Sequence, residues 1–349
     1  MKLELLKNMP LQILILVVYA VLIKSDWVSK GEIKANIYDP DQIWVANDGN
    51  VIVNDHAQRE APIQKIDFEK DEVIAFLKKG RGPGEVSEIF YKNITQFSDG
   101  KIFLWDAGLG RITVFNSDLE YITNINGDAL KTFFQHIELI NDSTVITFSS
   151  KDPFLKAWRM NDYTINKSDL LWEKSVKDFP QLSSLENPVM MQTLFFHNYK
   201  GVLYTSFEYS SLLMAVDEKG IKFITDGPDE IPIPDPRSGG KYTLPSIGED
   251  PEGARDITVD DKYVYVVFSG ENISKSEQMK YAHNVEALIE RVKHAKRLWI
   301  FERESGEFIK EVELPLSAKS FQVFNNEAYL LNTTNDEPKI VRYQLPDDL

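Results

Sequence analysis

The chain contains no cysteine, and this absence excludes several kinds of protein. Without thiols there is no disulfide framework, cysteine nucleophile, iron–sulfur cluster or cysteine-ligated zinc. A bacterial lipoprotein needs a cysteine after its leader, so we do not expect a lipoprotein. Positive charge is also scarce, because 39 Lys and Arg stand against 54 Asp and Glu and give a formal net charge of −15. Since an acidic surface repels phosphate backbones, we expect no nucleic-acid partner.

Long apolar runs are scarce as well, and the clearest one lies near the N-terminus. It extends from Leu11 to Ile23, which is shorter than the roughly 20 residues that a membrane-spanning helix needs. The run fits the hydrophobic region of a secretory signal, with Val18-Tyr19-Ala20 as a small-residue cleavage site. We therefore expect residues 1–26 to be a signal peptide or signal anchor and residues 27–349 to form the exported domain.

A repeated pattern fills most of the remaining chain. Six segments combine a short apolar alternation, a turn and a second β-forming run. The second halves of these segments begin at Asp48, Asp99, Asp142, Lys200, Asp261 and Asn326. Turn pairs such as Asp-Gly and Lys-Gly join two strands tightly, because they tolerate a positive φ. Two further alternating runs follow several of the hairpins, so each unit is predicted to hold four antiparallel strands.

Units of this size must stack on one another to bury both faces of their sheets, and a radial arrangement also protects the sheet edges. We therefore predict an all-β fold, a six-bladed β-propeller of four-stranded antiparallel blades. The sixth unit has only three strands, while a β-like stretch at 31–38 precedes the first hairpin. We expect this N-terminal strand to complete the last blade and close the ring.

One segment departs from the repeat and is predicted to be a helix inserted into blade five. Apolar residues recur at helical spacing from Met279 to Ala295, and Ser274 with Glu277 fits a capping box. We expect the helix to pack on the side of the blade. The alternative is a docking role for its basic far end, which includes Lys296 and Arg297.

Two loops stand out by composition. The segment 225–253 is rich in Pro, Gly and acidic residues and is predicted to be a long loop between blades. The second loop, KKGRGPGEVSEIF from Lys78, is neither a Walker loop nor a dinucleotide fingerprint. Its glycines permit positive φ angles. It is either a plain crossover between blades or a loop that brings Arg81 and Glu85 to the mouth of the central channel.

The second loop also carries a family resemblance. The run from Gly80 to Glu85 resembles the G-x-GPGE-F signature of six-bladed β-propeller proteins of Bacteroidetes, described as TolB-like or NHL-like, with Val86 in place of the usual Phe. WDAGLGRITVFN from Trp105 looks like one NHL repeat, and 256–270 with 297–315 is similar to a TolB-like segment. The resemblance implies a propeller exported to the periplasm or cell envelope of a Gram-negative bacterium. It implies little about activity.

Six side chains are candidates for ligand binding: Arg81, Glu85, Trp105, Asp106, Arg111 and Arg255. Asp106 and Arg111 flank the short loop AGLG, where they form either a structural ion pair or, with Trp105, a surface that stacks on a sugar or peptide. Arg255 precedes the inner strand of blade five and could face the channel.

Histidines offer a weaker, enzymatic alternative. His136 and His197 fall on or beside predicted inner strands, and the family resemblance includes lyases that hold a metal on channel histidines. The chain has neither an H-E-x-x-H nor a G-x-S-x-G motif. We therefore predict a monomeric binding module for a peptide, glycan or protein, with no cofactor, no catalysis and membrane contact only through its N-terminal segment. The alternative is an NHL-type lyase or hydrolase with a metal in the channel.

Overall fold

The structure is a computed structural model of the 349-residue chain, and the residues that it describes begin at Trp27. The described ranges are 27–34, 37–87, 92–97, 99–131, 136–149, 151–180, 182, 194–231, 252–270, 274–280, 283–284, 295–334, 337–346 and 349. The predicted signal segment 1–26 therefore lies outside the described residues.

Within these ranges the strands form six four-stranded antiparallel sheets. Blade one holds β2 (Pro40–Val45), β3 (Val51–Asp55), β4 (Ile63–Asp67) and β5 (Glu72–Leu77). Blade two holds β6 (Lys92–Gln96), β7 (Ile102–Asp106), β8 (Arg111–Phe115) and β9 (Tyr121–Ile125). Blade three holds β10 (His136–Asn141), β11 (Thr144–Phe148), β12 (Leu155–Arg159) and β13 (Leu170–Lys174). Blade four holds β14 (Leu194–Tyr199), β15 (Val202–Phe207), β16 (Leu212–Asp217) and β17 (Gly220–Asp226). Blade five holds β18 (Ala254–Val259), β19 (Tyr263–Phe268), β20 (Ala295–Glu302) and β21 (Phe308–Ala318). Blade six holds β22 (Ser320–Phe324), β23 (Glu327–Asn332), β24 (Lys339–Gln344) and β1 (Val28–Ile33).

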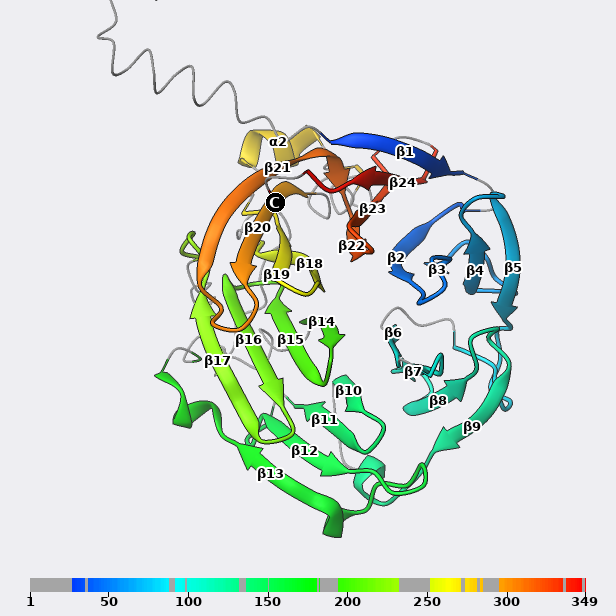
Figure 1. The fold of residues 1–349 in the computed structure, drawn as a ribbon, viewed down its shortest axis with the longest axis vertical. Coiled ribbons are helices and arrows are strands. Elements are labelled where there is room, and N and C mark those ends of the chain that lie inside the picture. Colours follow the sequence, from blue (N-terminus) through cyan, green and yellow to red (C-terminus); the bar gives the residue numbers. More distant parts are fainter. Residues whose placement is uncertain are drawn as a thin grey trace, which may run out of the picture.

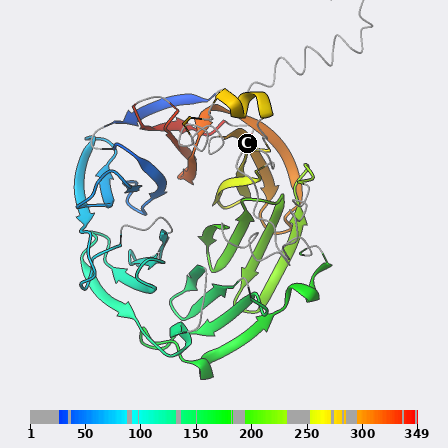
Figure 2. The same cartoon turned by 180° about the vertical axis from the view of Figure 1, so that it is seen from behind.

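The six sheets are arranged around a central axis, with the first strand of each blade innermost, as Figure 1 shows from one end and Figure 2 from the other. The predicted six-bladed propeller is therefore confirmed. The predicted hairpins join the first and second strands of every blade. Three of the turns contain a glycine with the positive φ that the turn pairs predict: Gly49, Gly100 and Gly201 have φ angles of 83°, 86° and 81°.

The core lies between neighbouring blades. Ile146 of blade three packs in one cluster with Leu203 of blade four, and Tyr265 of blade five packs with Phe321 of blade six. Because both faces of each sheet are covered, side chains on both sides of the middle strands are buried; in β7, the second strand of blade two, all five residues are buried. The blades therefore stabilise one another as a single ring.

An N-terminal strand closes the ring as predicted, but at a different position. The strand is Val28–Ile33, whereas the sequence pattern favoured 31–38. It pairs antiparallel with β24, with a register shift between Ser29 and Gly31. Trp27 anchors its start, since the indole Nε1 donates to the carbonyl oxygen of Glu313 at 3.1 Å and the ring packs edge-on against Tyr343. This contact fixes where the strand begins.

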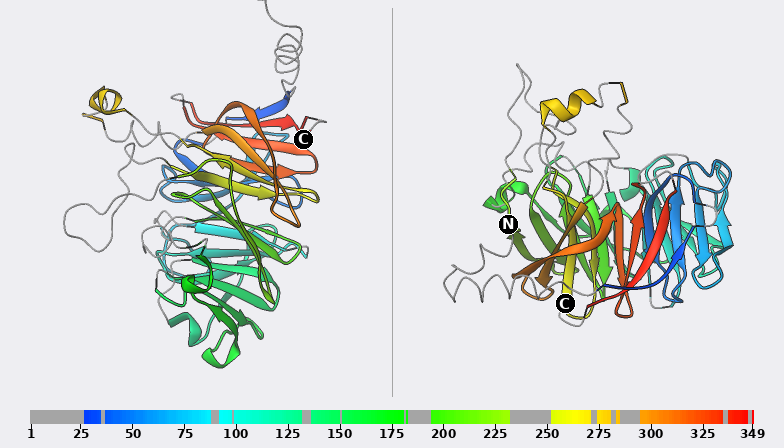
Figure 3. Two further views of the ribbon diagram at one scale, coloured as in Figure 1. Left: turned by 90° about the vertical axis from the view of Figure 1, so that its left-hand side faces the viewer. Right: turned by 90° about the horizontal axis from the view of Figure 1, so that it is seen from above.

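The inserted helix begins at the predicted capping box, Ser274 with Glu277, while residues 281–282 and 285–294 of its predicted extent lie outside the described residues. The described helix α2 covers Lys275–Lys280, and β20 already begins at Ala295, so Lys296 and Arg297 belong to a strand. The described part of α2 projects from one end of the ring (Figure 3), and Met279 is 75% exposed, so the expected packing on the blade is not seen there. Short 3₁₀ helices occur at Ala129–Lys131, Lys167–Asp169 and Val176–Asp178. Over the described ranges, no helix has the length and apolar character needed to cross a bilayer.

The two ends of the ring differ in their connections. We call one end the hairpin rim, because the tight turns between first and second strands lie there: 46–50, 97–101, 142–143, 200–201, 260–262 and 325–326. Since successive strands alternate in direction, the connections between second and third strands, and the crossovers that enter the inner strands, lie at the opposite end. We call that end the crossover rim. Its longest connections are 78–91, 175–193, 227–253 and 269–294.

Candidate functional site

The crossover from blade one to blade two is held by its own backbone and by one arginine. Val86 N–H donates to the carbonyl of Lys78 and Gly80 N–H to that of Val86, both at 2.9 Å. The guanidinium of Arg111 donates to three carbonyls of the crossover, those of residues 81, 82 and 85, at 3.2, 2.7 and 2.6 Å. A guanidinium suits this role because it carries five N–H donors in a fixed geometry. Arg111 therefore pins the crossover to the edge of blade two.

The acidic residues predicted beside this arginine are engaged in the same crossover. The Glu85 carboxylate accepts the Gly82 N–H at 2.6 Å. Asp106 is buried and accepts the backbone N–H and hydroxyl of Ser87 at 2.6 and 2.5 Å. Instead of pairing with each other to brace their own hairpin, Asp106 and Arg111 both bind the chain that enters their blade. Carboxylate–amide bonds of this kind are stronger than neutral ones.

The Asp106 contact recurs in other blades. Asp55, at the end of the second strand of blade one, accepts the backbone N–H groups of Tyr38 and Asp39 at 2.8 and 3.0 Å. In blade six, Asn332 Nδ2 donates to the carbonyl of Ser317 at 2.6 Å. In each case a polar side chain at the end of the second strand fixes the backbone that leads into the first strand. This recurrence indicates a structural role for Asp106.

The crossover lies at the perimeter of the ring and away from the channel mouth that the sequence suggested for Arg81 and Glu85. Gly84 has φ 74°, and a Cβ atom there would lie 2.8 Å from Cβ of Tyr121, the first residue of the outer strand β9. Arg81 is exposed at this position. Trp105 is only 8% exposed and packs in the core between blades two and three, so its ring offers no stacking surface.

Arg255 is buried in a group of three charges near the start of β18. Its Nη1 lies 2.8 Å from Glu208 Oε1, and its Nη2 contacts the carboxylate of Glu252. Arg255 and Glu252 are 6% and 2% exposed. The group joins the turn after β15, in the middle of blade four, to the beginning of blade five. Removing one member would leave an uncompensated charge in the interior. The role of Arg255 is therefore structural, since its ion pairs hold the two blades together.

Two buried carboxyl groups on inner strands were missed by the sequence reasoning. Glu138 on β10 accepts Thr95 Oγ1 at 2.8 Å and also contacts Asn93 Nδ2, both on β6. Burial raises its pKa to about 8, although both hydrogen bonds act in the opposite direction. Asp256 on β18 accepts Ser320 Oγ at 2.5 Å, and burial raises its pKa to about 6. The sequence signal that could have revealed both groups is an acidic residue within an otherwise apolar inner strand.

The two histidines of the metal hypothesis lie on inner strands, as expected. His136 is buried, with its ring 5.3 Å from that of Phe196. Burial lowers the pKa of His197 to about 4, so its imidazole is neutral near pH 7. Across the described part of the chain, no group of three or more His, Asp or Glu side chains is placed to hold a metal ion.

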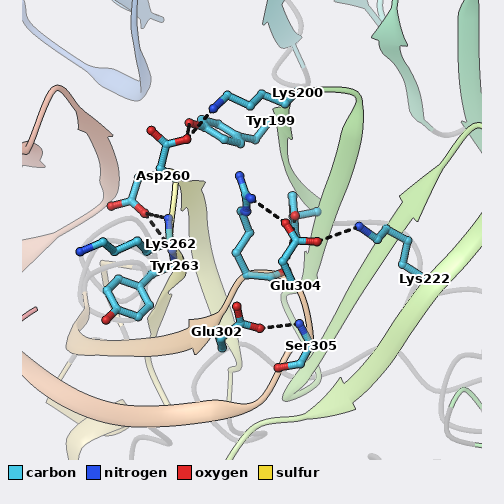
Figure 4. Close-up of polar contacts among 12 residues, drawn as sticks. Tyr199, Lys200, Lys222, Asp260, Lys262, Tyr263, Glu302, Glu304 and Ser305 are labelled. Atoms are coloured by element: carbon cyan, nitrogen blue, oxygen red, sulfur yellow. Dashed lines mark hydrogen bonds and ion pairs between the residues drawn. The ribbon is translucent and has the colours of Figure 1, made fainter.

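A further polar cluster lies on the hairpin rim at blades four and five (Figure 4). Tyr199 Oη donates to Asp261 at 2.7 Å, and Lys200 Nζ lies 2.5 Å from the same carboxylate. The guanidinium of Arg303 lies 5.2 Å from the centre of the Tyr199 ring and pairs with Glu304 at 2.5 Å. The contacts of Tyr199 and Lys200 with Asp261 run from blade four to blade five, so the cluster joins the two blades.

Comparisons with solved structures agree with the fold. The chain is similar to a member of the duf4221 family from Bacteroides vulgatus, with a TM-score of 0.57 and 14% identity over 91% of this chain and 97% of that one. A candidate exported protein from Bacteroides fragilis gives 0.49 and 9% over 92% and 94%, and a streptogramin B lyase gives 0.48 and 11% over 90% and 96%. No protein-family model matches the chain, and no curated protein matches it in sequence. The chain is thus an all-β six-bladed propeller with structural neighbours in Bacteroides.

Proposed function

We propose that the protein is an exported binding module, which holds a ligand or protein partner at its crossover rim without transforming it. The observation that carries the proposal is the unequal distribution of connections. The four longest ones all begin and end at the crossover rim, whereas two to five residues separate the first and second strands at the hairpin rim. Loops on a rigid frame are the usual location of recognition sites.

The crossover rim also has the exposure that recognition requires. The described residues of α2 are exposed, and Met279 is the most exposed large apolar side chain among the described residues. Export is proposed from the signal-like segment 1–26, together with the name of the neighbour from Bacteroides fragilis. Membership of the TolB-like or NHL-like group is proposed from the run Gly80 to Glu85, the stretch WDAGLGRITVFN from Trp105, and 256–270 with 297–315.

The test is to screen the purified full chain against arrays of glycans and peptides, and to repeat the screen with a variant in which 271–294 is replaced by a short Gly-Ser turn. We expect the variant to keep the far-UV spectrum of the ring and to lose the array hits. The control variant replaces exposed hairpin-rim residues, Asp142 and Lys219, with Ser and should keep every hit. Equal binding by the loop variant would contradict the proposed rim.

The enzymatic alternative is tested on the same samples. Mass spectrometry of each array hit after incubation reports bond cleavage, and elemental analysis of the purified chain reports metal content. Unchanged hits agree with a binding module. Cleaved hits together with stoichiometric metal would replace the binding module by a lyase or hydrolase, and His136 and His197 would then be the first residues to substitute.

A further inference from the structure

An exposed face lies on β5, the outermost strand of blade one (Figure 1). Among the described strands, β5 has a neighbour on one side only, which is β4. Glu72, Ile74 and Phe76 are exposed, whereas the residues between them, Val73 and Ala75, are partly buried. Alternate residues of a strand point to the same side. The exposed side chains of β5 therefore form one continuous row along the perimeter of the ring.

The centre of this row is large and apolar. Ile74 is 49% exposed and Phe76 is 51% exposed. On none of the other outer strands do the described residues place two large exposed apolar side chains at alternate positions, since those of β9 and β13 are consecutive residues. An exposed apolar patch that is rimmed by charges is typical of a contact surface. This feature of β5 therefore distinguishes blade one from the other blades.

Opposite charges stand at the two ends of the row. Glu72 is its first residue, and Lys78, which directly follows β5, is exposed at the other end. The backbone position of Lys78 is fixed, because its carbonyl oxygen accepts the Val86 N–H at 2.9 Å. We call Glu72, Ile74, Phe76 and Lys78 the β5 strip. The order along the β5 strip is acid, apolar, apolar, base.

The β5 strip is complementary to itself. When a second copy lies against it in the antiparallel direction, centred on Ala75, Glu72 faces Lys78 of the second copy. In the same arrangement Ile74 faces Phe76 of the second copy. A two-fold axis repeats both contacts, because the same surface of each copy then forms the interface. Every apolar side chain therefore meets an apolar one and every charge meets its opposite, whereas a parallel arrangement would bring like charges together.

The irregular pairing of β5 decides how two strips can meet. The register between β4 and β5 shifts around Ile74, which stands as an extra residue between the paired positions of Val73 and Ala75. A bulge of this kind bends an edge strand and hinders a further strand from pairing with it. The two strips therefore meet through their side chains, face to face, and not through backbone hydrogen bonds.

We propose that the protein forms a weak two-fold homodimer in which the β5 strips of two copies pack against each other. Four side chains from each copy make a smaller contact than permanent dimers have, so we expect a dissociation constant in the micromolar range or above. A monomer was expected from the sequence, in which the exposure of β5 is not visible. The inference goes beyond the binding function proposed above, because a homodimer presents two crossover rims to one polymeric ligand.

The experiment is sedimentation equilibrium of the full chain over a range of concentrations, which measures the dimerisation constant. We expect the parent to show a concentration-dependent equilibrium between monomer and dimer. Glu72→Lys places Lys opposite Lys at both ends of the contact, and Lys78→Glu places Glu opposite Glu. Each single variant should dimerise about tenfold or more weakly. Phe76→Ser removes the largest apolar group of the β5 strip and should also dimerise about tenfold more weakly.

Rescue separates this contact from a general effect of charge. The variant that carries both Glu72→Lys and Lys78→Glu restores opposite charges across the two-fold axis and should dimerise as the parent does. A mixture of the two single variants should form heterodimers, because all four charged positions then meet their opposites. Neither single variant should form such dimers alone.

The matched controls are Lys219→Glu, at an exposed turn of blade four, and Ile309→Ser, at a position of β21 that is 46% exposed; both should dimerise as the parent does. A parent that stays monomeric at the highest attainable concentration would overturn the homodimer, while hits on the arrays would leave the binding module standing. The apolar run Leu11–Ile23 is present in every variant. Association that is equally strong in the parent and in both single variants would therefore lie outside the β5 strip and overturn it. Loss of the dimer in the doubly substituted variant would overturn the antiparallel arrangement.

Discussion

The buried acid Glu138 makes a prediction that runs against the usual pH dependence of protein stability. Its pKa is raised to about 8 in the folded protein from an ordinary value of 4.5, because burial disfavours the charged form. A raised folded pKa means that the contribution of this carboxyl is fully favourable below pH 4.5 and is lost as the pH rises towards 8. The protein should therefore lose stability on going from pH 5 to pH 7.

The magnitude follows from the two pKa values. Each pH unit well inside the interval costs about 1.4 kcal/mol of unfolding free energy, and the loss between pH 5 and pH 7 is about 2.5 kcal/mol. Glu138→Gln keeps the shape of the side chain and cannot ionise. It should remove this loss, so that the free energy of the variant relative to the parent rises by about 2.5 kcal/mol from pH 5 to pH 7. Asp256, with its pKa raised to about 6, adds a loss of the same sign, and His197, with its pKa lowered to about 4, acts in the opposite direction; both contribute equally to the two proteins and cancel in the difference between them.

The assay is urea unfolding of the parent and Glu138→Gln, followed by tryptophan fluorescence at pH 5 and pH 7. Glu72→Gln, at an exposed position of β5, is the control and should leave the parent's pH dependence unchanged. The reasoning about this buried acid would be refuted if the unfolding free energies of the parent and of Glu138→Gln changed by the same amount between pH 5 and pH 7, whichever the direction.

Three other substitutions test the interior contacts. Asp106→Ala removes the acceptor of three hydrogen bonds and should lower the unfolding free energy by about 3 kcal/mol. The control is Asp142→Ala, at an exposed turn, which should cause no measurable change. Equal unfolding free energies of the two variants would refute the role of Asp106. Arg255→Met leaves two acids near the start of β18 without their cation and should cost about 3–5 kcal/mol in urea unfolding at pH 7; a cost below that of Asp142→Ala would argue against the buried charge group. Gly84→Ala forces a side chain against Tyr121 at a positive φ and should cost about 1–3 kcal/mol in the same assay, so an unchanged melting temperature would show that the crossover is not packed as described.

The blades could be predicted because their signals are local. Each hairpin combines apolar alternation with a turn pair that tolerates positive φ, and both features lie within a few residues of one another. Gly49, Gly100 and Gly201 occupy those turns. The number of blades then follows from counting hairpins, and the ring follows from the need to cover both faces of each sheet.

The sequence could predict that an N-terminal strand closes the last blade, but it could not predict which residues form that strand. The run Val28–Ile33, VSKGEI, has no apolar alternation, and its residues before Ile33 are mostly exposed. Its place is set by contacts with residues about 300 positions away, chiefly those of Trp27 with Tyr343 and Glu313. The predicted end of the inserted helix was wrong for a related reason, since Ala295 satisfies the helical spacing but packs as the first residue of β20.

The candidate residues were selected for their chemistry, while their roles depend on partners that the sequence does not place. Arg111 and Asp106 were expected to face each other across a short loop. They bind backbone groups of a crossover 19–30 residues earlier instead, because the loop folds back onto their blade. Glu138 escaped notice for the same reason, since its burial depends on β6 and β10 meeting at the axis.

Hydrogen exchange of the full chain tests the central claim, a single ring closed by its first strand. Amides of Val28–Ile33 that pair with β24 should exchange as slowly as those of β23 and β24, because the strand can open only when blade six opens. Exchange of these amides at the rate of an unstructured peptide, while β23 and β24 stay protected, would contradict the closed ring.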